Sequence, residues 1–254
     1  MLDPLTLAII FATFLFAGAV KGVIGLGLPT ISLALLTVAF DLTTAMALLL
    51  VPSFATNLWQ AMIGGNGIAI MRRLWLFFTM ATVTVGLGGL MLTRVDLDVL
   101  SALLGVLIAL YAGFGIFGLS FTITPTRERW AGPLAGAVNG VLTGMTGSFV
   151  MPGVMYLQSI GLTRDMLIQA MGILFTLSTL ALGISLGAND LLDRAQGLMS
   201  ASGVLPAVIG MVCGQQIRHR LSEQLFRRIF FFSLMLLGLY IIASALVLSN
   251  GGMR

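Results

Sequence analysis

The stretch from residue 17 to residue 30 interrupts an apolar run that would otherwise form one smooth helix. It contains Pro29 and, ahead of it, four glycines: Gly18, Gly22, Gly25 and Gly27. In a bilayer, backbone that leaves helical geometry is tolerated only where protein or a water-filled cavity satisfies its freed N–H and C=O groups. A break at this depth therefore points to a buried site.

The same motif returns in the second half of the chain. Residues 135–141 repeat residues 17–23 with a single change, Lys21 to Asn139. The match extends beyond the motif, to these pairs: Leu42-Thr43 and Leu162-Thr163, Met46 and Met166, Gly88 and Gly214, Arg94 and Arg220. The chain is thus an internal duplication, with repeat one at 1–124 and repeat two at 125–254, a construction common among transporters.

Apolar runs of spanning length follow one another along all 254 residues, of which 58% are hydrophobic and 9% charged. This composition predicts an all-α polytopic membrane protein with a single membrane domain, 1–254. Cys213 and His219 are each the sole residue of their type, so we expect no metal site and no cofactor. The amino terminus lacks the basic region of a cleaved signal, so the first apolar run is expected in the mature protein.

The run between Asp3 and Asp41 is long for one helix and short for two full spans. It predicts a re-entrant hairpin, a broken helix whose two arms meet at residues 25–29. A second hairpin is expected over 131–161, broken at 143–152. Each hairpin should be followed by three transmembrane helices, at 43–63, 74–92 and 97–119 in the first repeat and at 166–186, 197–217 and 225–248 in the second.

Arginine distribution sets the expected orientation. If each hairpin leaves on the side where it entered, three arginines lie on one side: Arg94, Arg194 and Arg254. Nine lie on the other: Arg72, Arg73, Arg127, Arg129, Arg164, Arg218, Arg220, Arg227 and Arg228. Counting each broken run as a simple span gives six against six. The positive-inside rule favours the hairpins, and it predicts inverted repeats with both termini periplasmic.

Pro29 and Pro152 each begin a returning arm, so two helix N-termini should point into the protein. Such ends bind anions through free N–H groups and partial positive charge. The expected substrate-binding residues are Gly25, Gly27, Pro29, Thr30, Thr56, Asn57, Gly144, Gly147, Ser148 and Pro152. For Gly18, Gly22, Gly136 and Gly140 the favoured interpretation is close helix packing.

Polar side chains also line one face of the span at 43–63. They recur at helical spacing, as Ser53, Thr56, Asn57 and Gln60, and either line a pathway or bond neighbouring helices. Thr176 is the expected repeat partner of Thr56. Lys21 is expected to snorkel to the inner headgroups. No carboxylate sits in the middle of a span, which disfavours a side-chain proton relay.

Two Gly-rich broken helices ending in Pro, each followed by a Leu-Thr-x-x-Met helix, resemble the TauE/SafE family of sulfite and organosulfonate exporters. The resemblance implies a transporter of sulfur-containing anions in the bacterial inner membrane, with the anion held between the hairpin tips under alternating access. The alternatives are a permease for another small organic anion, such as a carboxylate, or a membrane scaffold or assembly factor. No enzyme activity is expected. The expected partners are a small anion and the bilayer, not nucleic acid, with a homodimer left open.

Overall fold

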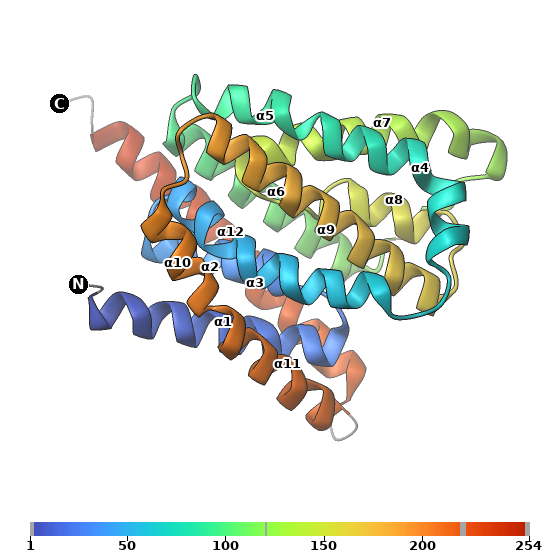
Figure 1. Cartoon of the computed structure of the whole chain (residues 1–254), viewed down its shortest axis with the longest axis horizontal. Helices are drawn as coiled ribbons and strands as arrows, with labels where there is room; N and C mark the ends of the chain where they lie inside the picture. The colour runs from blue at the N-terminus through green and yellow to red at the C-terminus, as the bar shows by residue number, and fades with distance from the viewer. Residues whose placement is uncertain (1–2, 120, 219–221, 252–254) are drawn as a thin grey trace. The chain divides into compact units, whose positions relative to one another are not determined.

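A computed structural model describes residues 3–119, 121–218 and 222–251 of the chain. Arg220, Arg254 and His219, used above, lie outside these residues. The described part is helical, with twelve helices (Figure 1): α1 (Pro4–Ile24), α2 (Leu28–Ala39), α3 (Leu42–Met62), α4 (Gly67–Val83), α5 (Val85–Leu92), α6 (Leu97–Phe117), α7 (Pro125–Thr146), α8 (Gly153–Ser159), α9 (Arg164–Ala188), α10 (Arg194–Ser202), α11 (Val204–Ile217) and α12 (Glu223–Gly251).

Seven stretches among the described residues are long and apolar enough to cross a membrane. Six of them correspond to the six spans predicted after the hairpins, and the seventh is α1. At 1.5 Å per residue, the 21 residues of α1 extend about 31 Å, close to the hydrocarbon thickness of a bilayer. The prediction of an all-α polytopic membrane protein is confirmed.

The helices form two compact units that do not coincide with the two sequence repeats. Unit 1 contains α1, α2, the first half of α3, α6 and α10 to α12. Unit 2 contains the rest of α3, α4, α5 and α7 to α9. Each unit draws helices from both halves of the sequence, because the first helix of each hairpin packs against a helix of the other half. In unit 1, α1 packs along α11, and in unit 2, α7 packs along α4 and α5.

Glycines allow the helix backbones of unit 1 to approach closely. A Cβ atom on Gly18 would collide with the backbone of Ala207, and one on Gly22 would collide with Met211 and Gly214. The contacts advance together along both helices, so α1 and α11 are parallel. This confirms the packing interpretation for Gly18 and Gly22.

The same arrangement occurs in unit 2. A Cβ on Gly136 would strike Phe77, one on Gly140 would strike Ala81, and one on Gly144 would strike Val85. The packing interpretation holds for Gly136 and Gly140. It also applies to Gly144, which we expected at the substrate; this glycine lies in the contact of α7 with α5, because the close helix approach continues one turn further than the repeated motif.

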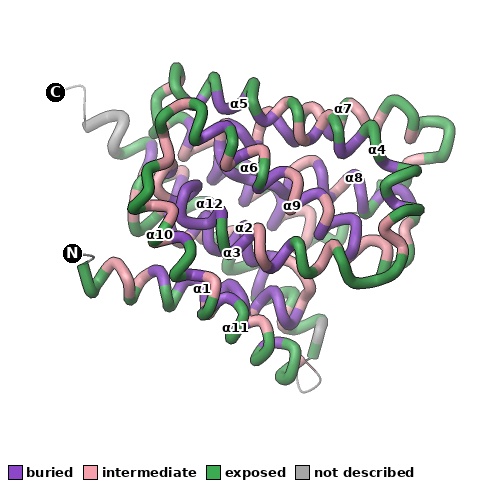
Figure 2. The backbone as a smooth tube through the Cα atoms, in the orientation of Figure 1, coloured by how far each residue is buried: buried purple, intermediate pink, exposed green. Residues whose placement is uncertain are grey.

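Both predicted helix breaks are present, and each is followed by a short helix. In unit 1, α2 turns back after Gly27 and packs on α1 (Figure 1). It also lies beside α12, since Gly27 is near Phe230, and Asp41, just past the end of α2, shares a pocket with residues 240–245. In unit 2, α8 returns along α7, since the amide of Gly153 bonds Asn139 and Tyr156 reaches Gly132. The returning arms are short, twelve and seven residues, so neither spans a bilayer at 1.5 Å per residue. Figure 2 shows α2 buried along most of its length.

The helix ends correct the alignment of the repeats. Gly25 closes α1 in left-handed geometry (φ 85°), and its N–H bonds the Lys21 carbonyl. Gly147 closes α7 in the same way (φ 73°), and its N–H bonds the Thr143 carbonyl. Gly25 and Gly147 are therefore structural equivalents, and Lys21 corresponds to Thr143 rather than to Asn139. The sequence motif is displaced by one helical turn because glycines four residues apart serve the same packing face.

Candidate functional site

The tip of the unit 1 hairpin presents the backbone N–H groups at the start of α2 to the interior of the protein. Gly27 (φ 110°) precedes α2, and Pro29 occupies its first turn, as predicted. The first helical bond runs from the Ile31 N–H to the Gly27 carbonyl, 2.8 Å, so the N–H groups of Leu28 and Thr30 lie ahead of the helical ladder. Leu28 is fully buried and Thr30 is 6% exposed. This tip is a helix N-terminus with positive potential, shielded from solvent.

Lys21 lies one turn before this tip. Its side chain is 4% exposed, which contradicts the expectation that it snorkels to the headgroups: the helices of unit 1 cover it. Lys21 is the one lysine or arginine among the buried residues of the described chain, and it lies one turn from the tip, so it joins the candidate anion ligands.

The tip of the unit 2 hairpin is tied by side chains. Thr143 Oγ1 donates to the Ser148 carbonyl at 2.9 Å, and the Ser148 N–H donates to Thr146 Oγ1 at 3.3 Å. Ser148 is 4% exposed. Pro152 directly precedes α8 rather than standing inside it, and α8 is a single short stretch with little macrodipole. The hydrogen-bond donors of this tip therefore come mainly from side chains and not from the start of α8.

Asn139 is the site residue that the sequence argument missed. It is fully buried, and its Oδ1 accepts the Gly153 N–H at 2.9 Å. Its Nδ2 makes no hydrogen bond with any described residue. A buried amide donor of this kind costs free energy unless something accepts its hydrogens. The sequence offered one signal, a polar residue at position 139 within a stretch of small and apolar residues.

The polar residues of α3 turn inward, as their spacing predicted. Thr56 is 1% exposed and Asn57 is fully buried. Gln60 instead bonds the Ile168 carbonyl of α9 at 2.8 Å, which is the interhelical role that we had left open. The hydroxyl of Ser53 is buried without a hydrogen-bond partner among the described residues.

The corresponding residues on α9 differ from the expected ones. Asp41 caps the start of α3 by accepting from the Thr44 N–H, and Thr163 caps α9 by accepting from the Met166 N–H. Counting from these caps, Thr56 corresponds to Ser178, not to Thr176. Burial agrees, because Ser178 is fully buried and its hydroxyl is unpaired in the described part of the chain, whereas Thr176 bonds its own helix.

The candidate site residues thus fall into two groups, one in each unit. Gly25, Gly27, Pro29 and Thr30 lie at the unit 1 tip with Lys21. The second group lies in unit 2 and comprises Thr56, Asn57, Gly147, Ser148 and Pro152, with Asn139 added and Gly144 assigned to packing. Both groups present N–H and O–H donors. Among the described residues, no three His, Cys, Asp or Glu side chains are placed to hold a metal ion.

The model of the sulfite exporter TauE/SafE family matches residues 10–241, nearly the whole chain. No curated protein and no solved structure matches it. The matched region covers all the candidate site residues, the whole second hairpin and the first hairpin from residue 10 onward. The protein is therefore a member of the sulfite exporter TauE/SafE family of membrane transporters.

Proposed function

We propose that the protein exports small sulfur-containing oxyanions, such as sulfite or organosulfonates, across the bacterial inner membrane. One observation carries this proposal beyond the family: each hairpin tip holds buried, mostly uncharged hydrogen-bond donors inside a membrane-spanning chain. Donors without carboxylates suit an anion, because an oxyanion accepts several N–H and O–H bonds at once.

The two tips supply different donors. At the unit 1 tip these are the amides at the start of α2 and the ammonium group of Lys21. At the unit 2 tip they are the Asn139 amide and the hydroxyl of Ser148, since the Thr143 hydroxyl already donates to the Ser148 carbonyl. The inverted orientation of the repeats and alternating access belong to this proposal. Their support is the matched pairing of α1 with α11 and of α7 with α4 and α5.

The membrane potential can drive such export. An inside-negative potential favours outward movement of an anion by about 2.3 kcal/mol per charge per 100 mV. Since acidic residues are absent from the buried polar residues of the described chain, a proton-coupling carboxylate is not required. We expect flux to follow an imposed potential.

The test is flux in vesicles that contain the purified full-length protein. Sulfite, thiosulfate, an alkyl sulfonate, sulfate and a short carboxylate are loaded in parallel, and a potassium gradient with valinomycin sets the potential. We expect sulfite or sulfonate to move fastest and to respond to the sign of the potential. Preference for the carboxylate would identify an organic-anion permease instead. Absence of protein-dependent flux for every anion would refute the transporter proposal and favour a scaffold.

A further inference from the structure

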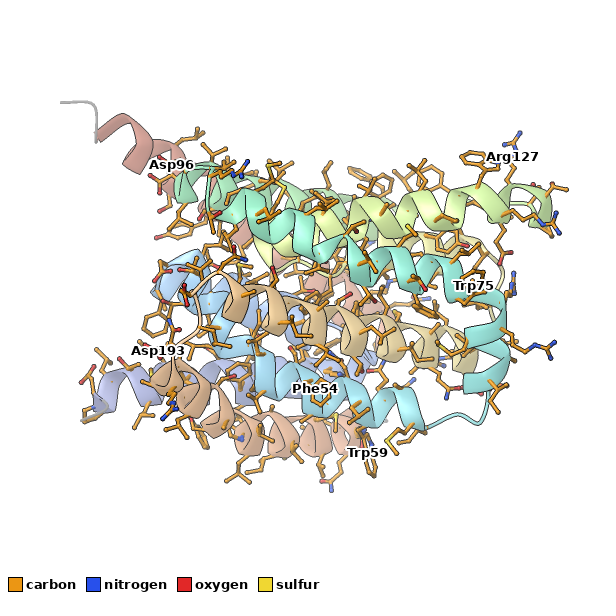
Figure 3. The ribbon with its side chains drawn as sticks, turned by 45° about the horizontal axis from the view of Figure 1, so that its top comes forward. Phe54, Trp59, Trp75, Asp96, Arg127 and Asp193 are labelled. Carbon is orange, nitrogen blue, oxygen red and sulfur yellow. The ribbon has the colours of Figure 1, made fainter. Side chains whose placement is uncertain are left out.

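A polar pocket opens in unit 2 where α4, α7 and α8 meet. Its volume is about 470 Å³, and its lining includes Arg72, Arg73, Trp75, Glu128, Arg129 and Tyr156. We refer to it as the arginine pocket. In the sequence, these arginines indicate only membrane orientation. Figure 3 shows Trp75 and Arg127 at the same end of unit 2, where α4 and α7 both begin.

The backbone of α4 breaks at this pocket. Leu74 leaves helical geometry (φ −113°, ψ 15°), so α4 consists of two helical pieces with a kink between them. Arg72 and Arg73 stand immediately before the kink, and Trp75 follows it. Residues on both sides of the break line the pocket. In a straight helix the same residues would point in different directions around the helix axis.

Arg73 is fixed in the wall of the pocket. Its Nε donates to Glu128 Oε1 and its Nη2 to Glu128 Oε2, each at 2.8 Å. Nη2 also donates to the Ile160 carbonyl at the end of α8, at 2.8 Å. This bidentate pair gives a defined geometry. With one carboxylate against three arginines among the lining residues, the pocket keeps a net positive charge.

Tyr156 supplies a hydroxyl donor at the pocket. The residue is 5% exposed, and its ring packs on Phe77 with centroids 4.8 Å apart. Both Arg73 and Glu128 are close enough to act on it electrostatically. Among the described residues the Tyr156 hydroxyl forms no hydrogen bond, yet it lines the pocket. Because the hydroxyl oxygen keeps accessible surface although the residue as a whole is buried, it can donate to a ligand in the pocket.

The pocket is connected to the hairpin tip by a single short helix. The N–H of Gly153, at the first residue of α8, bonds Asn139, and the carbonyl of Ile160, just past its end, bonds Arg73. The seven residues of α8 cover only about 10 Å at 1.5 Å per residue. A ligand in the arginine pocket would therefore lie about one short helix away from the donors of the tip.

We infer that the arginine pocket binds the oxyanion group of the transported substrate, a sulfite or a sulfonate, before it reaches the unit 2 tip. Arg72 and Arg129 supply charge, and the Tyr156 hydroxyl donates a hydrogen bond. Trp75 and Phe77 offer apolar surface to the organic part of a sulfonate. This inference rests on the proposed function. The phosphate of an anionic lipid shares the same chemistry, and the experiment below separates the two sources.

The first test uses vesicle flux with Tyr156→Phe, Arg72→Gln and Arg129→Gln. Tyr156→Phe retains the ring packing and removes only the hydroxyl. We expect each variant to raise the half-saturating sulfite or sulfonate concentration by about fivefold to tenfold with little change in maximal rate, because one charge-assisted hydrogen bond is lost. Arg94→Gln, an exposed arginine outside the pocket lining, is the matched control. If the Tyr156 and Arg129 variants behave like Arg94→Gln while wild-type flux persists, the pocket inference is wrong and the proposed function stands.

The second test is a binding titration of the full-length protein in detergent with sulfite, methanesulfonate and short-chain phosphatidylglycerol. It does not depend on transport, so it still tests the pocket if the flux experiment refutes the proposed function. We expect sulfite or sulfonate binding to weaken in Tyr156→Phe and Arg129→Gln but not in Arg94→Gln. Binding of phosphatidylglycerol alone, with the same dependence on Tyr156, would overturn the inference in favour of a lipid site. Thermal unfolding of each variant verifies that it is folded.

Discussion

The side-chain oxygen of Asn139 accepts a hydrogen bond from the backbone N–H of Gly153 at 2.9 Å, and both residues are buried. Fourteen positions of chain separate them. The bond joins the middle of α7 to the first residue of α8, so it closes the unit 2 hairpin from inside. The same Asn139 amide keeps its Nδ2 donor unpaired within the described chain. One side chain thus combines a structural role with a donor suited to an anion.

Replacing Asn139 with Leu should therefore affect both stability and transport. The Gly153 N–H would lose its partner in a buried place, which costs about 1–3 kcal/mol. Substrate affinity should fall as well, because the Nδ2 donor disappears. Thermal unfolding in detergent and vesicle flux measure the two effects.

Ser32→Ala is the matched control for the Asn139 variant. Ser32 is also fully buried, but its hydroxyl donates to carbonyls of its own helix, Leu28 and Pro29. Its removal leaves no buried amide without a partner. Equal losses in Asn139→Leu and Ser32→Ala would show that the Asn139–Gly153 bond has no special importance.

Gly25 and Gly147 should tolerate alanine poorly. Both end a helix with positive φ, 85° and 73°, where an L side chain costs about 1–2 kcal/mol. We expect Gly25→Ala and Gly147→Ala each to lower the free energy of unfolding by this amount. Gly86→Ala is the control, since Gly86 is helical and a Cβ there meets no atom within 4 Å; it should be neutral or slightly stabilising. Equal stability of all three variants would contradict this account.

The sequence alone anticipated the two helix breaks and the burial of most candidate site residues. Glycine and proline breaks are local signals, so the end of α1, the start of α2 and the inward face of Thr56 and Asn57 could be anticipated. Burial of Lys21 could not, because it depends on which helices of the other half pack around α1. The equivalence of Gly25 and Gly147 was obscured for a similar reason, since repeated glycines match at several offsets of one turn.

The arginine pocket escaped the sequence argument for a different reason. Arg73 and Glu128 are 55 positions apart, and Tyr156 comes from a third element. Their meeting depends on the kink at Leu74, where no glycine or proline marks the break. Arginines near span ends therefore indicated only membrane orientation.

Acid should remove the contribution of Asp41 to stability. Burial raises the pKa of this carboxyl, but hydrogen bonds from the Thr43 and Thr44 hydroxyls and from the Thr44 N–H outweigh it, so the pKa lies below the ordinary 3.8. When folding lowers the pKa of a carboxyl, the carboxyl stabilises the folded protein at any pH above its pKa in the unfolded chain. This stabilisation is lost as the pH falls through its pKa in the folded protein. The stabilisation by Asp41 should therefore be lost below about pH 4.

Asp41→Ala tests the direction of this pH dependence of stability. As the cap of α3, Asp41 should contribute about 1 kcal/mol at pH 7, and the difference from wild type should shrink as the pH falls below 4. Asp190→Asn removes an exposed carboxylate from a left-handed turn position that Asn also accepts (φ 58°), and it should leave the curve unchanged. Thermal unfolding in detergent between pH 7 and pH 3 gives the comparison. A constant difference at every pH would contradict the proposed titration.

Labelling of single cysteines tests the orientation of the chain. In unit 1, α1 and α2 are antiparallel, so Asp3 and Asp41 should lie on the same side of the membrane, which we propose is the periplasmic side. The helix α3 then runs 21 residues from Leu42 to Met62 and is long enough to cross, so Arg72 should lie on the opposite side.

Cys213, the only natural cysteine, is exposed and is first replaced by Ser. In intact cells, a membrane-impermeant maleimide should label cysteines introduced at Asp3 and Asp41, and it should label one at Arg72 only after the membrane is opened. Labelling of Asp41 and Arg72 from the same side would contradict the crossing of α3. Labelling of Asp3 and Asp41 from opposite sides would mean that the first apolar run crosses the membrane once, and the nine-to-three distribution of arginines would lose its explanation.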